Sequence, residues 1–163
     1  MPRITFALAT MLSFMAFTPV AAQDLMKGMG AYDAKDYLTA LQEWRPLAEQ
    51  GDADAQYFLG VMYKNGNGVL QDYSESAKWY RLAADQGDVE AQNNLAVMYE
   101  EGNGVLQNNI MAHMWYNLAA ANGHEKAGEW RDKRAGLMTN ADASKAQAMA
   151  RGCMSGGYTR CGN

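Results

Sequence analysis

Several residue groups that mark enzymes and metal sites are scarce or missing in this sequence of 163 residues. It contains two cysteines, two histidines and three prolines. It has no Gly-x-Ser-x-Gly and no His-Glu-x-x-His motif, which would indicate a serine hydrolase or a zinc protease. We therefore expect no metal, no cofactor and no enzyme activity.

Positive charge and long apolar runs are also scarce. The formal net charge is −4 and no block of Lys and Arg occurs, so nucleic-acid binding is not expected. One apolar run, Ile4–Phe17, follows Arg3 and leads to small residues ending at Ala22. This pattern predicts a signal peptide over residues 1–22, cut near Ala22, and a periplasmic or secreted protein without a membrane contact. The alternative is an uncleaved anchor, although the run is short for a span of about 20 residues.

What the sequence does contain is a repeat. Residues 51–72 recur 36 positions later as residues 87–108, and 14 of the 22 positions are identical. A fixed period of this length indicates a solenoid. Within each copy apolar residues recur with the 3.6-residue period of a helix. The predicted fold class is all-α, an α/α superhelical solenoid of antiparallel helix pairs with about eight helices.

The period divides the predicted domain, residues 23–163, into three units, a capping helix and a tail. The units span about residues 37–72, 73–108 and 109–135, and the capping helix and tail span 139–163. In the third unit Arg131 and Arg134 stand where the second has Leu95 and Met98. A solenoid needs a polar end, so this unit is either a C-terminal cap or a degenerate repeat, and both interpretations predict the same fold.

These repeats resemble a known family. Ala-x3-Leu-x2-Met-Tyr-x2-Gly-x-Gly-Val begins at Ala55 and again at Ala91, and Trp-Tyr-x2-Ala-Ala-x2-Gly begins at Trp79 and Trp115. Together they look like the Sel1-like repeat (SLR), a relative of the tetratricopeptide repeat, over about residues 31–125. The resemblance implies a superhelix with a concave groove, and scaffold or adaptor roles in the bacterial envelope.

Polar positions on the first helix of each unit are the candidate partner-binding residues. They form two columns with the 36-residue spacing, and the first helices of such solenoids usually line the groove. The columns are Gln42, Lys78 and Met114, and Arg45, Arg81 and Asn117. The alternative is an ordinary solvated face.

The cysteines and histidines lie outside or late in the repeats. In an exported chain Cys153 and Cys161 indicate a disulfide, and the alternatives are a metal or redox pair. His113 and His124 lack the spacing of metal ligands, so both are expected on the solvated surface. The glycines of the two Gly-Asn-Gly loops are expected to turn the chain with positive φ and not to bind phosphate.

The resemblance therefore implies an exported scaffold or adaptor that binds a protein or peptide in its groove, and we expect a monomer. The alternative is a β-lactam-binding or hydrolysing enzyme, as suggested for cysteine-rich relatives. Those relatives carry a cysteine pair in each repeat, and the repeats here have none. A third possibility is a purely structural envelope protein.

Overall fold

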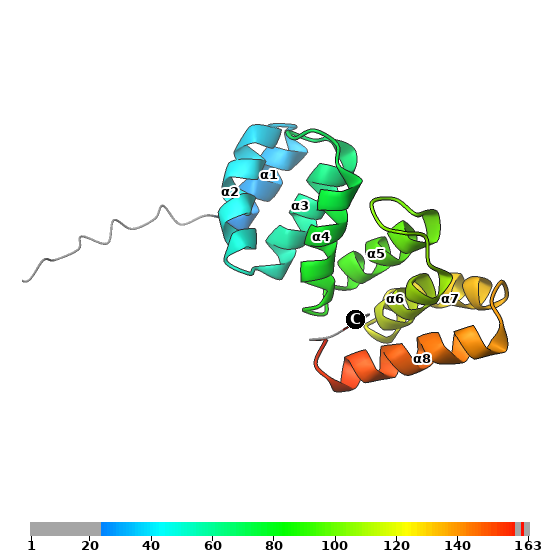
Figure 1. Cartoon of the computed structure of the whole chain (residues 1–163). Helices are drawn as coiled ribbons and strands as arrows, with labels where there is room; N and C mark the ends of the chain where they lie inside the picture. Colours follow the sequence, from blue (N-terminus) through cyan, green and yellow to red (C-terminus); the bar gives the residue numbers. More distant parts are fainter. Residues whose placement is uncertain (1–23, 159–160, 162–163) are drawn as a thin grey trace, which may run out of the picture.

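The computed structural model describes residues 24–158 and residue 161, so the predicted signal peptide lies outside the described part of the chain. The described residues form eight α-helices and the predicted all-α solenoid is confirmed (Figure 1). The helices are α1 (Leu25–Asp33), α2 (Tyr37–Glu49), α3 (Ala53–Asn65), α4 (Tyr73–Ala84), α5 (Val89–Glu101), α6 (Asn109–Ala121), α7 (Ala127–Ala135) and α8 (Asn140–Ser155).

Local sequence signals set where the repeat helices begin and end. Asp52 and Asp88 each accept a hydrogen bond from the backbone N–H three residues ahead, which satisfies an otherwise unpaired donor at the start of α3 and α5. Gly66 and Gly102 end the same helices in the left-handed conformation, with φ of 71° and 76°. The expected positive φ of the loop glycines is therefore observed.

Apolar residues with helical spacing form the core. Leu59 and Met62 of α3 are 0% exposed, and Leu95 and Met98 of α5 are 1% exposed. Each helix from α1 to α6 packs against the next one in the chain. This neighbour-to-neighbour packing is typical of repeat proteins, whose units bury their apolar faces against one another.

A ladder of buried amide side chains links the units. Gln92 donates to the carbonyl oxygen of Ala84 (3.2 Å) and accepts from Nδ2 of Asn122 in the next unit (3.0 Å). Gln56 makes the same two bonds one unit earlier. Gln92 is 0% exposed, so its amide has no water to replace these partners. The repeated glutamine therefore holds neighbouring units in register.

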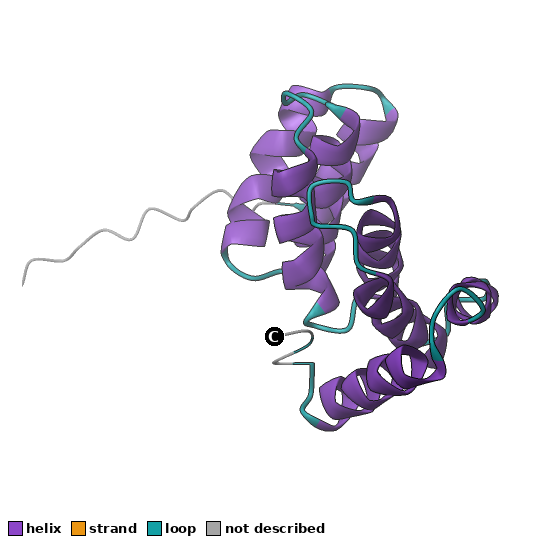
Figure 2. Ribbon diagram, turned by 45° about the vertical axis from the view of Figure 1, so that its right-hand side comes forward, coloured by secondary structure: helices purple, strands orange, loops and turns teal. Residues whose placement is uncertain are grey.

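The C-terminal helix leaves the repeat pattern. α8 packs on α6 and runs alongside it (Figures 1 and 2). Thr139 caps its start, since Asp142 N–H donates to the Thr139 hydroxyl at 3.1 Å. Its buried residues Ala146, Ala150 and Cys153 join the larger of the two core clusters. α6 is consequently enclosed by α5, α7 and α8.

Candidate functional site

The predicted groove residues lie on α2, α4 and α6, but the structure does not leave them equally accessible. Gln42 and Lys78 are exposed, and Arg45, Arg81 and Asn117 are half-buried. The sixth, Met114, is 0% exposed. The prediction that Met114 is available to a partner is therefore wrong.

The burial of Met114 follows from the position of α8. Lys78 occupies the equivalent place on α4 and is exposed, so the repeat itself does not bury this position. α6 differs from α4 in having α8 packed on it, and eight of the 13 residues of α6 are buried. The part of the face that stays open belongs to α2 and α4. We call Gln42, Arg45 and Lys78 the open face.

The two arginines of the second column make the same contact in successive units. Nη2 of Arg45 donates to the Tyr63 hydroxyl at 3.1 Å, and Nη2 of Arg81 donates to the Tyr99 hydroxyl at 3.4 Å. Each bond joins the first helix of a unit to its second helix. In the third unit the column changes to Asn117, which accepts from Arg131 at 3.2 Å.

Arg81 makes two further contacts that Arg45 does not make. Its Cζ atom lies 5.0 Å from the ring centroid of Trp115, a cation–π distance. Its Nη1 donates to the carbonyl oxygen of Cys161, 80 residues further along the chain. Arg81 and Lys78 also line a cavity of about 240 Å³ between α4 and α5. Lys78 forms an ion pair with Glu75 on the same helix.

Asp85 lies one turn beyond Arg81 at the end of α4. Its Oδ1 atom is buried, and no hydrogen bond to it is found in the described part of the chain. Burial raises the pKa of this carboxyl to about 6, although the nearby Arg81 guanidinium acts in the opposite direction. A carboxyl group with a buried oxygen that lacks a hydrogen bond within the described residues therefore lies close to Arg81.

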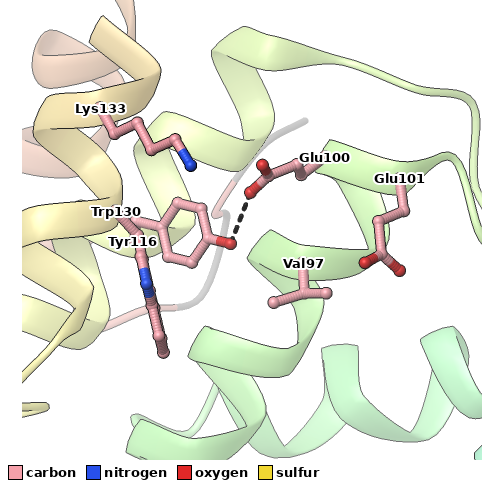
Figure 3. Close-up of a pocket in the computed structure, with 6 residues that line it drawn as sticks. All are labelled: Val97, Glu100, Glu101, Tyr116, Trp130 and Lys133. Carbon is pink, nitrogen blue, oxygen red and sulfur yellow. Dashed lines mark hydrogen bonds between the residues drawn. The ribbon is translucent and has the colours of Figure 1, made fainter.

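Sequence reasoning missed a second cavity, of about 200 Å³, between α5, α6 and α7 (Figure 3). The Tyr116 hydroxyl donates to Oε2 of Glu100 at 2.7 Å, and Glu100 also pairs with Arg134. Burial and then the Glu101 charge raise the pKa of Tyr116 to about 12. Glu100 turns toward Tyr116 while Glu101 points elsewhere, so the two carboxylates do not form an acid–base pair (Figure 3). Residues from three helices line this cavity, which no sequence motif signals.

The two histidines lie in different surroundings. His113 is 1% exposed, so the expectation that it lies on the solvated surface is wrong. Burial, followed by the Arg131 charge, lowers its pKa. Nδ1 of His124 accepts from the backbone N–H groups of Lys126 and Ala127, at 3.3 and 3.1 Å, at the start of α7.

Two searches of the described residues bear on other functions. No group of three or more His, Cys, Asp or Glu side chains in residues 24–158 and 161 could hold a metal ion. No helix within those residues is both long enough and apolar enough to cross a membrane. Cys153 and Cys161 form a disulfide, with Cα atoms 4.9 Å apart.

Comparison with known proteins explains the repeat. The Sel1 repeat family matches residues 53–88 and 89–124. The first matched repeat begins at α3, whereas the predicted units begin near residues 37 and 73, so the two sets of limits differ by about half a unit. No curated protein matches the chain.

Two solved structures share the fold. A protective antigen of uropathogenic Escherichia coli strains that displays an SLR fold has 41% sequence identity and a TM-score of 0.61, covering 63% of this chain and 23% of the antigen. A Sel1 repeat protein from Oxalobacter formigenes has 34% identity and a TM-score of 0.64, covering 66% of this chain and 44% of that protein. The chain thus spans less than half the length of either relative.

The family match, the two related structures and the 36-residue helix pairs agree. Sel1 repeats support a repeat protein of the interaction type. The chain therefore contains two Sel1 repeats, over residues 53–88 and 89–124, in a solenoid similar to solved SLR-fold proteins.

Proposed function

We propose that this chain is an exported interaction protein that binds a protein or peptide segment on its open face. The observation that carries the proposal is that Gln42 and Lys78 stay exposed while α8 closes the equivalent position on α6. Partner binding is thereby confined to the first two units.

The chemistry of the open face indicates what a partner must offer. Arg45 and Lys78 are cations and Gln42 adds an amide, so the face is rich in hydrogen-bond donors. Leu38 lies one turn before Gln42 on α2 and is 66% exposed, which adds an apolar contact. An extended segment with carboxylate or carbonyl acceptors and one apolar side chain fits this surface. Because the face is small, a few anchors would carry the affinity.

Two features support an extracytoplasmic location for this binding. Residues 1–22 have the pattern of a signal peptide, and Cys153 and Cys161 form a disulfide, a bond typical of oxidising compartments. We propose a periplasmic or secreted protein that acts as a monomeric adaptor or regulator in the envelope. A β-lactam enzyme has no comparable support, because the repeats lack the cysteine pairs of the relatives to which that activity is linked.

The test is a crosslinking pull-down from the periplasm with Arg45→Glu/Lys78→Glu as the altered protein. The matched control is Lys126→Glu, which reverses an exposed charge in the turn between α6 and α7. We expect the wild type and the control to capture the same partner and the double variant to lose it at least tenfold. Equal capture by all three folded proteins would show that the open face is not the binding site.

A further inference from the structure

Arg45 and Arg81 occupy the same place in successive units but differ in what surrounds them. Both donate to a tyrosine of their own unit. Only Arg81 lies over the Trp115 ring and donates to the carbonyl oxygen of Cys161. The C-terminal tail therefore contacts the solenoid at Arg81 of the second unit. This contact joins residues 80 positions apart and is not part of the packing between neighbouring repeats.

Two described tail residues form this contact. The Tyr158 hydroxyl donates to Oδ1 of Asn122 at 2.7 Å, which joins the tail to the amide ladder. The ring lies beside Gly87, where a Cβ atom would be in ordinary van der Waals contact with it at 3.7 Å. Cys161 is 2% exposed and belongs to the larger core cluster. The tail thus inserts one aromatic side chain and presents one main-chain carbonyl.

This arrangement has the chemistry of a bound peptide. A guanidinium stacked on an aromatic ring keeps its N–H groups directed at an acceptor, and a main-chain carbonyl is available in any peptide. The Tyr158 ring supplies the side-chain anchor three residues earlier. Nothing in the contact requires that the segment belong to the same chain.

We propose that Arg81, Trp115, Gly87 and Asn122 form a peptide-binding subsite that is occupied in cis by the chain's own tail. Its ligand is a segment with a tyrosine followed, three residues later, by an accessible main-chain carbonyl. The Cys153–Cys161 bond fixes the tail in the subsite, and a partner segment enters only when the tail leaves. The tail's role as an internal ligand stands on its own, whereas its exchange with a partner rests on the proposed function.

The disulfide determines how strongly the tail competes with a partner segment for the subsite. With the bond closed, Cys161 stays attached to Cys153 in the buried part of α8, which limits how far its carbonyl can move from Arg81. With the bond open, the tail is held to the solenoid by the two hydrogen bonds to Asn122 and Arg81 and by its covalent connection to α8, which corresponds to an effective concentration in the mM range. An external segment can compete at that level.

The first test measures hydrogen exchange of the full chain before and after reduction with dithiothreitol, which converts the disulfide to two thiols and is itself oxidised to a cyclic disulfide. We expect exchange in the segment around Tyr158 to rise at least tenfold while α4 and α5 keep their protection. Arg81→Ala raises tail exchange further in the reduced protein, and the matched Arg45→Ala leaves it unchanged. Unchanged exchange around Tyr158 would overturn the proposal. Loss of protection in α4 and α5 together with the tail would also overturn it, because the tail would then unfold only with the rest of the protein.

The second test uses a fluorescent peptide of residues 156–163 with Cys161→Ser as the probe. The receptor is the full chain with Cys153→Ser, Tyr158→Ala and Cys161→Ser, which lacks the disulfide and the tyrosine anchor and keeps only the main-chain carbonyl of residue 161. We expect it to bind the probe at least tenfold more tightly than the oxidised wild type, and to lose that binding with Arg81→Ala but not with Arg45→Ala. Equal binding of the probe by the receptor, its Arg81→Ala and Arg45→Ala variants and the oxidised wild type refutes the subsite. That result would not bear on partner binding at the open face, which the pull-down tests.

Discussion

At the scale of single residues, two glycines of the same loop differ in the space around them. Gly102 and Gly104 of the second loop both have positive φ, 76° and 70°. A Cβ atom at Gly102 would lie 3.3 Å from the Gln107 side chain, whereas one at Gly104 would lie 2.1 Å from the backbone oxygen of Tyr73. The first contact needs Gln107 to shift by only a few tenths of an ångström, whereas the second requires the backbone at the start of α4 to move.

Gly104→Ala should therefore cost more stability than Gly102→Ala. Both variants place a side chain in the left-handed region, which costs about 1–2 kcal/mol. Gly104→Ala adds a backbone clash of about 1–3 kcal/mol. Urea unfolding of both variants gives the difference directly. Equal losses would mean that backbone conformation alone requires glycine in this loop.

Asp85 shows how burial penalises a single charge. Its folded pKa of about 6 lies above the ordinary value of 3.8, so the folded state holds the proton more tightly than the unfolded state. Folding is therefore penalised above pH 6, and the penalty disappears as the pH falls toward 4. We expect Asp85→Asn to raise the free energy of unfolding by about 1 kcal/mol at pH 7.5, after allowing for partial solvent screening, and to have no effect near pH 4.

Glu49 offers the matched control for this prediction. It occupies the equivalent position at the end of α2 and is exposed. Glu49→Gln should change stability by less than about 0.5 kcal/mol at either pH. Chemical denaturation at the two pH values compares the variants. A pH-independent gain for Asp85→Asn would attribute the effect to the amide's hydrogen bonds and not to the removed charge.

At the scale of elements, α8 departs most from the repeat. It packs on α6 and not on the preceding α7, which has only one buried residue, Ala127. The polar α7 ends the stack of second helices, as a terminal cap must. α8 then covers the apolar α6 and ends at the disulfide with Cys161. The third unit therefore depends on the C-terminal segment for its burial.

Opening the disulfide should measure this dependence. The loop of nine residues from Cys153 to Cys161 gives about 2.5 kcal/mol in the chain-entropy model. We expect Cys153→Ser/Cys161→Ser to lose that amount in urea unfolding, and reduction of the wild type to lose the same. A loss below about 0.5 kcal/mol would show that packing of α8 alone holds the tail region.

At the scale of the whole molecule, the amide ladder decides whether the units unfold together. Gln92 connects the second unit to the third through Asn122, and Asn122 in turn accepts from Tyr158 of the tail. Repeat proteins owe their cooperativity to such contacts between nearest neighbours. Breaking one rung should therefore weaken the coupling as well as the total stability.

Gln92→Met keeps the size of the buried side chain but leaves the Ala84 carbonyl and the Asn122 amide without their partner. We expect the free energy of unfolding to fall by about 2–3 kcal/mol, because each unpaired buried group costs about 1–3 kcal/mol. We also expect a broader urea transition, because the second and third units are then less tightly coupled. Gln107→Met is the control, since Gln107 donates to the Glu100 carbonyl from an exposed loop. Equal losses for the two variants would contradict a special role of the ladder.

Much of this architecture could be predicted because its causes are local. The stripe of Leu59 and Met62, the caps at Asp52 and Asp88 and the left-handed glycines all lie within a few residues of what they determine. The 36-residue period then placed equivalent residues on equivalent faces. The type of repeat, the fold class and the columns of polar residues follow from these short-range patterns.

The accessibility of those columns could not be predicted in the same way. Met114 is buried because α8 packs on α6, and His113 is buried within the same enclosed helix. The cavity beside Tyr116 likewise draws its lining from three helices. Spacing in one helix says nothing about which distant helix covers it.

The sequence by itself determined the repeat, its helices and the pairing of the two cysteines, since periodicity, capping and the oxidation of two thiols need no long-range information. The tertiary structure alone decided that the tail contacts Arg81, 80 residues away, and that the open face is limited to α2 and α4. The physical reason is that repeat packing acts between neighbours, whereas the tail contact depends on where a non-repeated helix brings the chain back onto the solenoid.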